Sequence, residues 1–384
     1  MRLAVFTSGR QDWGILLPVV RALQASSSLQ LLIIAGGMHG RDGQRPTTLD
    51  GCLIAEFVNT LPMGDDPLSV AHAAAATTSA LTDTLIKLHA DALLLLGDRT
   101  ETLAAALAAT CLHLPIFHLH GGEETTGAID NACRHALTQL AHLHFVAHPA
   151  FAERVKNMGA PANRVVVCGA PAIDLLLATE LFTADKLAKE LGLTSFGTEL
   201  IVCTYHPTTI AAQSPAQEIT TVILGITDFL SHQPSAHIIV TRANCDAGGA
   251  AINTAMENLA ARHAQVHLVK DLGVQRYWSL LAHAQVMLGN SSSGILEAPC
   301  FDLPVINIGD RQAGRLRVHP VHDVPVDPQA ISAALRDALR TPKLPVQPHA
   351  SAYGDGHAAK RICVAIEHFS HSVKNNKQLQ QVTP

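Results

Sequence analysis

Short apolar runs alternate with helix-like patterns along most of the chain. Leu3–Phe6 is apolar throughout and ends at polar Thr7, after which apolar residues recur at helical spacing between Ile15 and Leu23. A second run, Leu29–Ile34, is closed by two glycines. Because these runs are apolar at consecutive positions, they predict parallel strands that are covered on both faces. The same pattern predicts strands at 92–96, 116–119, 145–147, 201–204, 237–240, 266–269, 286–288 and 305–308, with helices at 100–112 and 130–141.

The strand and helix rhythm restarts after about residue 170, where Gly169 and Pro171 interrupt it. The fold class is therefore expected to be α/β, with two Rossmann-like domains facing each other across a cleft. Ligands of such sheets bind beyond the carboxyl ends of the strands, which makes the loops after strands the candidate site. The expected organisation is a first domain at 1–170, a second at 171–354, a helix at 355–370 that packs back on the first domain and a frayed tail at 371–384.

Composition narrows the class of protein. Hydrophobic residues make up 48% of the 384 residues and charged residues 15%, which is enough apolar material for two buried cores. The net charge of −5 provides no basic field for nucleic acid. No apolar run approaches the ~18 residues of a membrane span, and the run after Arg2 is too short for a signal peptide. The eight cysteines include no CxxC pair. These features predict a cytoplasmic protein that binds neither nucleic acid nor membrane.

Charged residues follow two predicted strands of the first half. Arg10 lies in the loop after the first strand, where a guanidinium could bind a phosphate or a carboxylate; an arginine that only caps a surface loop is the alternative. Asp98, Arg99 and Glu101 follow the strongly apolar strand at 92–96. Charges placed there cost desolvation, which favours a ligand site. Asp98 as the N-cap of the next helix is the alternative, and it leaves Arg99 without a role.

A histidine pair follows the next strand. His118 and His120 are two residues apart, so we expect them to share one face of that strand, and such a pair suggests a metal site. No HExxH motif or other carboxylate and histidine set completes a ligand shell, so no metal is expected. The glycines at 121 and 122 are expected to let the backbone approach a ligand and to leave Glu123 exposed at the rim. Burial and neighbours could then raise the pKa of Glu123 toward that of a working base.

Two further residues are candidates for proton transfer. Asp130 lies at the start of a predicted helix, where it is either a site residue or an N-cap. His206 follows the first strand of the second half, and Pro207 keeps it out of a helix. A histidine at such a strand end is a candidate acid or base, and a structural loop histidine is the alternative.

The most specific motif is a turn rich in serine, which we call the serine turn (residues 289–294). A buried strand leads into Gly289 and Asn290, then three serines and a predicted helix. Unpaired amides at a helix start, together with serine hydroxyls, predict a phosphate site. The GK[ST] of a P-loop is missing, so ATP hydrolysis is not expected. Glu297, about one helical turn on, could accept hydrogen bonds from two sugar hydroxyls, and Arg311 after the next strand could bind the same phosphates.

Taken together, the motifs resemble the hydrolysing UDP-N-acetylglucosamine 2-epimerases, in order and spacing from residue 1 to about 370. The match is most similar to the bacterial branch that serves sialic-acid and legionaminic-acid synthesis. The joint occurrence of GNSSSG and GDRQAGR makes the resemblance specific. The motifs are GDRTE (97–101), HLHGGE (118–123), ID-x-x-x-RH (129–135), YHPTT (205–209), GNSSSGILE (289–297), NIGDRQAGR (307–315) and YGDG (353–356).

The resemblance implies a GT-B-like fold, a homodimer, no metal or nicotinamide cofactor, and a UDP-sugar as the bound partner. It implies that the C2 proton and UDP leave the sugar, giving a 2-acetamidoglucal, and that water then adds to give UDP and the 2-epimer. Some members carry a glutamate where this chain has His120, which leaves open whether His120 or Glu123 is the acid/base group. The implied catalytic residues are Asp98, His120, Glu123, Asp130 and His206, and the implied UDP-binding residues are Arg10, Arg99, Asn290, Ser291, Ser292, Gly294, Glu297 and Arg311.

Several activities stay open at this level. The leading substrate is UDP-N-acetylglucosamine, which would give N-acetylmannosamine, and the second is UDP-N,N′-diacetylbacillosamine. A GT-B glycosyltransferase and a UDP-sugar sensor without turnover are alternatives from other classes. Because the predicted acids and the predicted phosphate ligands lie on different domains, we expect domain closure to assemble the site.

Overall fold

The elements of the chain form two compact units. Unit 1 comprises residues 1–123, 130–175 and 352–384, and unit 2 comprises residues 124–129 and 176–351, so the division falls within helix α6 (Pro171–Ala178). The computed structural model describes the backbone of residues 1–40, 45–64, 66–125, 129–196, 199–208, 213–243, 248–269, 272–341 and 343–381, and the side chains of all of these except residues 10, 11 and 373–381.

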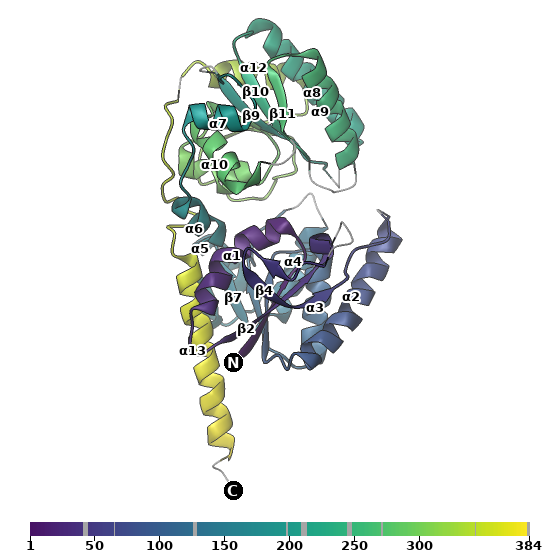
Figure 1. Cartoon of the computed structure of the whole chain (residues 1–384), viewed down its shortest axis with the longest axis vertical. Helices are drawn as coiled ribbons and strands as arrows, with labels where there is room; N and C mark the ends of the chain where they lie inside the picture. The colour runs from purple at the N-terminus through teal and green to yellow at the C-terminus, as the bar shows by residue number, and fades with distance from the viewer. Residues whose placement is uncertain are drawn as a thin grey trace. The chain divides into compact units, whose positions relative to one another are not determined.

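Unit 1 is built on one eight-stranded sheet, which is parallel except for β3 at its edge (Figure 1). The order across the sheet is β3 (Thr48–Leu49), β4 (Cys52–Val58), β2 (Gln30–Gly36), β1 (Arg2–Thr7), β5 (Ala92–Leu96), β6 (Ile116–Leu119), β7 (Leu143–Val146) and β8 (Val165–Val167). The strands that continuous apolar runs predict in this half are all present. The prediction of an α/β fold with two parallel-sheet units is confirmed.

The central strands of unit 1 are apolar at every position because helices cover both faces of the sheet. In β1, Leu3 and Val5 pack with α1 (Arg10–Gln24), whereas Ala4 and Phe6 point to the other face. Alternate residues of a strand point to opposite faces, so each face needs its own apolar set. The second face is covered by α2 (Pro67–Lys87) and α3 (Thr100–Cys111), with α4 (Asp130–Leu140) contributing. Helix α5 (Pro149–Asn157) and the short helices η1 (Gly37–Gly40) and η2 (Ala162–Arg164) also belong to this unit.

The sequence pattern did not predict α2 or β4. Helix α2 is rich in alanine and threonine between Leu68 and Leu81, so no sharp apolar stripe marks it. Its start is nevertheless encoded, because Asp66 accepts a hydrogen bond at 3.0 Å from the backbone N–H of Ser69 and Pro67 takes the first position.

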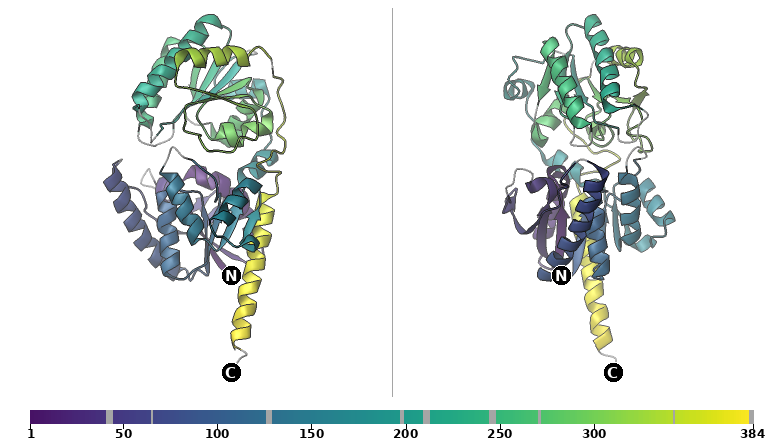
Figure 2. Two further views of the ribbon diagram at one scale, coloured as in Figure 1. Left: turned by 180° about the vertical axis from the view of Figure 1, so that it is seen from behind. Right: turned by 90° about the vertical axis from the view of Figure 1, so that its right-hand side faces the viewer.

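Helix α13 (Ala358–Gln381) brings the end of the chain back onto unit 1. Ile362 and Ile366 of this helix are fully buried in the hydrophobic core on the face of the sheet that α1 covers. Helices α1 and α13 lie side by side (Figure 2). The helix continues past residue 370, where a frayed tail is predicted, and the side chains beyond Ser372 lie outside the described residues. No helix in the described part of the chain is long and apolar enough to cross a membrane.

Unit 2 contains a six-stranded parallel sheet. The order is β11 (Val266–Val269), β10 (His237–Thr241), β9 (Leu200–Thr204), β12 (Val286–Gly289), β13 (Val305–Ile308) and β14 (Val321–Val324). Because the order reverses between β9 and β12, their carboxyl ends mark the switch point at which ligands of such sheets bind. The helices are α7 (Ala184–Glu190), α8 (Pro215–His232), α9 (Gly249–Arg262), α10 (Gly273–His283), α11 (Ser293–Leu296), η3 (Ala298–Phe301) and α12 (Pro328–Ala338).

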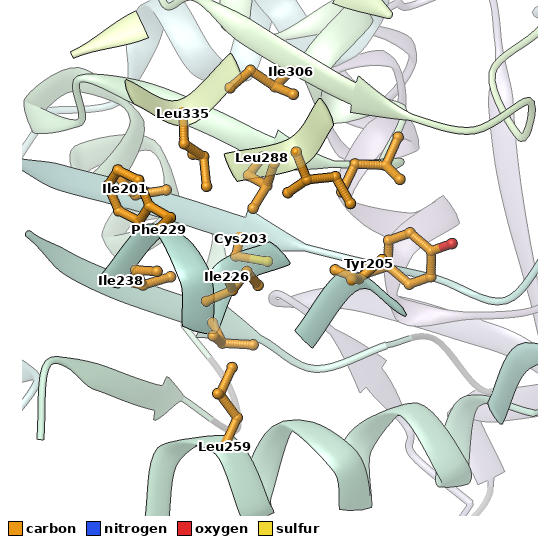
Figure 3. Close-up of a cluster of buried hydrophobic side chains, with 14 of the residues drawn as sticks. Ile201, Cys203, Tyr205, Ile226, Phe229, Ile238, Leu259, Leu288, Ile306 and Leu335 are labelled. Atoms are coloured by element: carbon orange, nitrogen blue, oxygen red, sulfur yellow. The ribbon is translucent and has the colours of Figure 1, made fainter. Parts of the chain in front are cut away.

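One hydrophobic core joins the sheet of unit 2 to α8, α9 and α12 (Figure 3). Ile201 and Cys203 of β9, Leu288 of β12 and Phe229 of α8 are fully buried within it. Tyr205 stands at the edge of this cluster with its hydroxyl directed away from the aliphatic side chains (Figure 3). There the hydroxyl donates to the carboxylate of Glu218, at 3.1 Å. The core therefore ends in a polar contact at the carboxyl end of β9, where the candidate site begins.

Candidate active site

Two consecutive charged residues, Asp98 and Arg99, follow β5 in unit 1, and each is held by an opposite charge. Asp98 accepts a hydrogen bond from the guanidinium of Arg134, a buried residue of α4. Arg99 Nε lies 3.4 Å from Oδ2 of Asp12 in α1. The loop after β5 is therefore fixed by ion pairs to two different helices. The structure differs from the alternative in which Asp98 caps α3, because the cap position is Arg99, whose side chain makes no capping hydrogen bond.

Asp12 and Arg134 have no predicted role, yet they hold two predicted site residues. Burial raises the pKa of Asp12, while the charge of Arg99 and a hydrogen bond from Ser8 Oγ at 3.1 Å lower it. Arg134 lies inside the ID-x-x-x-RH motif and Asp12 lies two residues after Arg10, but only the fold shows that α4 and α1 bring them to the end of β5. The predicted phosphate ligand Arg10 begins α1, and its side chain lies outside the described residues.

The two histidines of the HLHGGE motif do not share a strand face, so that prediction is wrong. Strand β6 ends at Leu119, and His120 has a φ of 64°, which turns the chain away from the strand direction. His118 is fully buried with its Nε2 2.8 Å from the carbonyl oxygen of Gly97, and burial lowers its pKa to about 4. His120 instead places its Nδ1 2.6 Å from Oε1 of Glu123.

Glu123 is buried rather than exposed at a rim, which corrects the sequence-based expectation. Only 4% of the residue is accessible. The reason is the turn at Gly122, which has a φ of 75° and no room for a side chain: a Cβ there would lie 2.5 Å from the backbone oxygen of Phe151 in α5. The turn thus packs onto α5 and folds Glu123 inward toward His120.

Asp130 is the first residue of α4 and is partly exposed, so it lies inside the helix rather than at an N-cap. It shares that helix with Arg134, the partner of Asp98. Across the part of the chain that the structure describes, no group of three or more histidine, cysteine, aspartate or glutamate side chains comes together as a metal site.

In unit 2, the side chain of Asn290 binds the backbone of His206 twice. Asn290 Oδ1 accepts from the His206 N–H at 2.7 Å, and Asn290 Nδ2 donates to the His206 carbonyl at 2.9 Å. Gly289 permits this approach, because its φ of 132° brings it against β9, where a Cβ would lie 1.9 Å from the carbonyl oxygen of Thr204. Burial, and then the nearby charge of Arg311, lower the pKa of His206 to about 3, so its imidazole is neutral at pH 7.

Arg311 joins the loops that follow β9, β12 and β13. Its Nε donates to the carbonyl of Pro207 at 3.2 Å and its Nη1 to the carbonyl of Asn290 at 3.1 Å. The next residue, Gln312, also donates to the Asn290 carbonyl, at 2.8 Å. The structure therefore brings together three predicted site residues, His206, Asn290 and Arg311, within unit 2.

The helix that the sequence predicts after the serine turn is present but short. Helix α11 has four residues and passes into η3, where Pro299 removes a backbone donor. The macrodipole of so short a helix is small, so the turn itself must supply the donors for an anion. Ser291 and Ser292 are partly exposed, whereas Gly294 faces β13, where a Cβ would lie 2.9 Å from Val305.

Glu297 is held by two protein donors. Trp278 Nε1 donates to its Oε1 at 2.8 Å, and the Ser293 hydroxyl donates to its Oε2. Ser293 in turn accepts from the Tyr277 hydroxyl at 2.8 Å. Burial raises the pKa of Glu297, and its hydrogen bonds to Ser293 and Trp278 lower it. Trp278 and Tyr277 lie on α10 outside the quoted motifs, so motif spacing gave no signal for them.

The chain is similar to known proteins over most of its length. The family model described as UDP-N-acetylglucosamine 2-epimerase matches residues 21–367. The GDP/UDP-N,N′-diacetylbacillosamine 2-epimerase (hydrolyzing) of Campylobacter jejuni is 34% identical over 84% of this chain and 84% of its own length. The UDP-N,N′-diacetylbacillosamine 2-epimerase (hydrolyzing) of Legionella pneumophila is also 34% identical, over 94% of both chains. The UDP-N-acetylglucosamine 2-epimerase of Neisseria meningitidis serogroup B is 28% identical over 82% of this chain and 81% of its own.

Solved structures share the fold. The UDP-GlcNAc 2-epimerase from Neisseria meningitidis bound to UDP-GlcNAc has a TM-score of 0.82 at 19% identity, covering 95% of this chain and 99% of that one. The Methanocaldococcus jannaschii UDP-GlcNAc 2-epimerase in complex with UDP-GlcNAc and UDP has a TM-score of 0.76 at 16% identity, covering 96% of this chain and all of the other.

Proposed function

The chain belongs to the UDP-N-acetylglucosamine 2-epimerase family, and we propose that it is a hydrolysing 2-epimerase of a UDP-linked 2-acetamido sugar. The observation that carries this proposal is the 34% identity, over 84–94% of the chain, to two hydrolysing 2-epimerases. The reaction takes UDP-sugar and water to UDP and the free 2-epimer. No relative named above is a glycosyltransferase, so that alternative is not favoured.

The substrate that we propose to test first is UDP-N,N′-diacetylbacillosamine. Sequence motifs alone favour UDP-N-acetylglucosamine, but the two relatives named for diacetylbacillosamine are 34% identical, against 28% for the meningococcal UDP-N-acetylglucosamine enzyme. UDP-N-acetylglucosamine is the second candidate, because a structure with a TM-score of 0.82 is solved with it.

We assign the leaving diphosphate to unit 2. Arg311 is fixed by two loop carbonyls beside Asn290, and the partly exposed hydroxyls of Ser291 and Ser292 follow in the serine turn. Donors that are held in place before the reaction stabilise the charge that develops on the departing phosphate. Glu297 is assigned to the ribose hydroxyls, and Arg10, Arg99 and Gly294 complete the proposed UDP-binding set.

We assign proton transfer at C2 chiefly to unit 1, with Asp98 and Asp130 as the proposed acids. In the first step the C2–H bond breaks, its electron pair forms the C1–C2 double bond, and the C1–O bond electrons leave with UDP. In the second, water oxygen bonds to C1 and a proton reaches the opposite face of C2. His206, which is neutral at pH 7, is proposed to assist the leaving group as a hydrogen-bonding group.

Incubation with each UDP-sugar in deuterated water, followed by ¹H and ³¹P NMR, tests this proposal. We expect UDP and a free mannose-configured sugar that carries deuterium at C2. A glycosyltransferase that hydrolyses its donor would release the original sugar with protium at C2, and a sensor would release no UDP. Either result would overturn the proposal. The ratio of kcat/KM for the two donors decides between the candidate substrates.

A further inference from the structure

His120 combines two energetically unfavourable features at the end of β6. Its φ of 64° lies in the left-handed region, which costs free energy for a residue with a side chain. Its Nε2 is buried and has no hydrogen-bond partner among the described residues. Buried polar atoms are nearly always paired, so an unpaired ring nitrogen on a strained residue points to a reactant that pairs with it.

Glu123 determines which nitrogen of His120 carries the proton. An ionised carboxylate only accepts hydrogen bonds, so with Glu123 ionised the 2.6 Å contact between His120 Nδ1 and Glu123 Oε1 places the ring proton on Nδ1. Nε2 then presents a lone pair. The side chains are 12% and 6% accessible, so water competes little for this hydrogen bond. The negative charge of Glu123 also stabilises the imidazolium that forms when Nε2 takes up a proton.

The position of His120 fits proton transfer at the substrate. The register of β5 and β6 pairs Leu96 with Leu119, and the Gly97 N–H donates to the Leu119 carbonyl at 3.1 Å. The loops that carry Asp98 and His120 therefore leave the sheet side by side. Glu123 is less suited to take up the proton directly, because its Oε1 is already engaged by His120 Nδ1.

We propose that His120 Nε2 is the base that removes the C2 proton, and that Glu123 is a positioning residue that acts through it. This inference rests on the proposed epimerase function and names the group for its first step. The C2–H bond breaks toward Nε2, giving an imidazolium paired with Glu123, while the former C–H electrons form the C1–C2 double bond and UDP takes the C1–O pair. The imidazolium then loses its proton to solvent, which resets the dyad.

The ring nitrogens of His120 report on the dyad without any turnover. In ¹⁵N-histidine-labelled protein, we expect the neutral His120 ring to carry its proton on Nδ1, and Glu123→Leu to shift the ring toward the Nε2–H form. A wild-type ring protonated on Nε2 would overturn the proposal. This readout stays valid even if no UDP-sugar is turned over, so its failure is distinguishable from failure of the proposed function.

Kinetics of matched variants test the base role. We expect His120→Ala to lower kcat for UDP release about 100-fold or more with a small change in KM, and added imidazole to restore part of the rate. Glu123→Gln keeps an acceptor for Nδ1 but removes the charge, so kcat should fall at least about tenfold. The control is His113→Ala, an exposed histidine with a similar φ of 55°, which should retain wild-type activity.

One outcome separates the base from a later role. If His120 acted only in rehydration, His120→Ala would still release UDP and would accumulate the 2-acetamidoglucal. Detection of that intermediate at a near-normal rate of UDP release would overturn the assignment. Added imidazole could also restore the rate of UDP release equally in His120→Ala and in the double variant Glu123→Gln/His120→Ala. Glu123 would then not act through the imidazole ring, and that part of the proposal would be wrong.

Discussion

The side-chain amide of Asn290 makes two hydrogen bonds to the backbone of His206. Its Oδ1 accepts from the His206 N–H at 2.7 Å, and its Nδ2 donates to the His206 carbonyl at 2.9 Å. A side chain of the serine turn thus sets the conformation of a residue in the loop after β9. Asn290 is 1% accessible, so no solvent can replace either hydrogen bond. This contact links the proposed phosphate site to His206, the histidine proposed to assist the departure of UDP, within unit 2.

Asn290→Asp should therefore impair catalysis through His206. The aspartate can still accept from the N–H, but it repels the carbonyl that Asn290 Nδ2 now binds. We expect kcat to fall about tenfold to 100-fold, because a small misplacement of a catalytic group has effects of that order. Steady-state kinetics measure it, with the exposed Asn59→Asp as the control. Wild-type kcat in Asn290→Asp would show that the hydrogen bonds from Asn290 to the His206 backbone do not affect the reaction.

Arg311→Lys should weaken UDP binding almost as much as Arg311→Ala. Two nitrogens of the guanidinium are bound to the Pro207 and Asn290 carbonyls, so its orientation depends on the planar fork, which lysine lacks. We expect isothermal titration to give a UDP Kd at least about tenfold higher for both variants. Arg340→Lys, at an exposed surface pair, is the matched control. Wild-type affinity in Arg311→Lys would mean that charge alone matters.

Asp98→Asn should abolish most turnover while UDP binding in unit 2 persists. The change also leaves the buried guanidinium of Arg134 without its carboxylate, so we expect the free energy of unfolding to fall by about 3 kcal/mol. The double variant Asp98→Asn/Arg134→Gln removes the buried guanidinium charge as well and should regain stability in urea titrations. Recovery of turnover along with stability would indicate a purely structural role for Asp98.

The strength of the apolar signal explains which parts of the fold are predictable from sequence. Strand β5 is apolar at five consecutive positions and is buried throughout, so its bounds are predicted without error. Helix α2 is missed because alanine and threonine give it no contrast between its faces. The loops after the strands are harder still, since no apolar pattern encodes the φ of 64° at His120. The inward turn of Glu123 depends on the packing of Gly122 against α5.

Motifs locate the candidate site more reliably than they describe its contacts. The placement of His206, Asn290 and Arg311 follows from strand ends that meet at one sheet edge. The partners Arg134 and Trp278 lie on helices, and their contacts with Asp98 and Glu297 require the tertiary fold. In contrast, the short helix after the serine turn is predictable from sequence alone, because Pro299 argues against a long helix there.

His206 should remain neutral throughout the range in which the enzyme is assayed. Burial and the charge of Arg311 lower its pKa to about 3, far below the ordinary value of 6.5. We therefore expect its ring ¹⁵N signals to stay those of a neutral imidazole from pH 8 down to pH 5. In Arg311→Ala, loss of the smaller, coulombic cause should raise the pKa while burial keeps it below 6.5. A wild-type midpoint near 6.5 would contradict the burial of this ring.

Two buried histidines in unit 1 should make the protein lose stability as the pH falls. His118 and His144 are paired across β6 and β7, and burial lowers the pKa of each to about 4. Between pH 4 and 6.5 the unfolded chain binds more protons than the folded one, so stability decreases as the pH falls through that window. As the pH falls from 7.5 to 5, the lowered pKa of each ring should decrease the free energy of unfolding by about 2 kcal/mol.

Replacement of one ring isolates this effect. His144→Gln removes a titrating group without touching the proposed site, so the stability lost between pH 7.5 and pH 5 should shrink by about 2 kcal/mol in urea unfolding. His322→Gln changes an exposed histidine of β14 and should leave the pH dependence as it is in the wild type. Because each variant is compared with itself at two pH values, any general cost of the substitution cancels. An unchanged slope in His144→Gln would mean that its ring is already protonated, or solvated, in the folded protein.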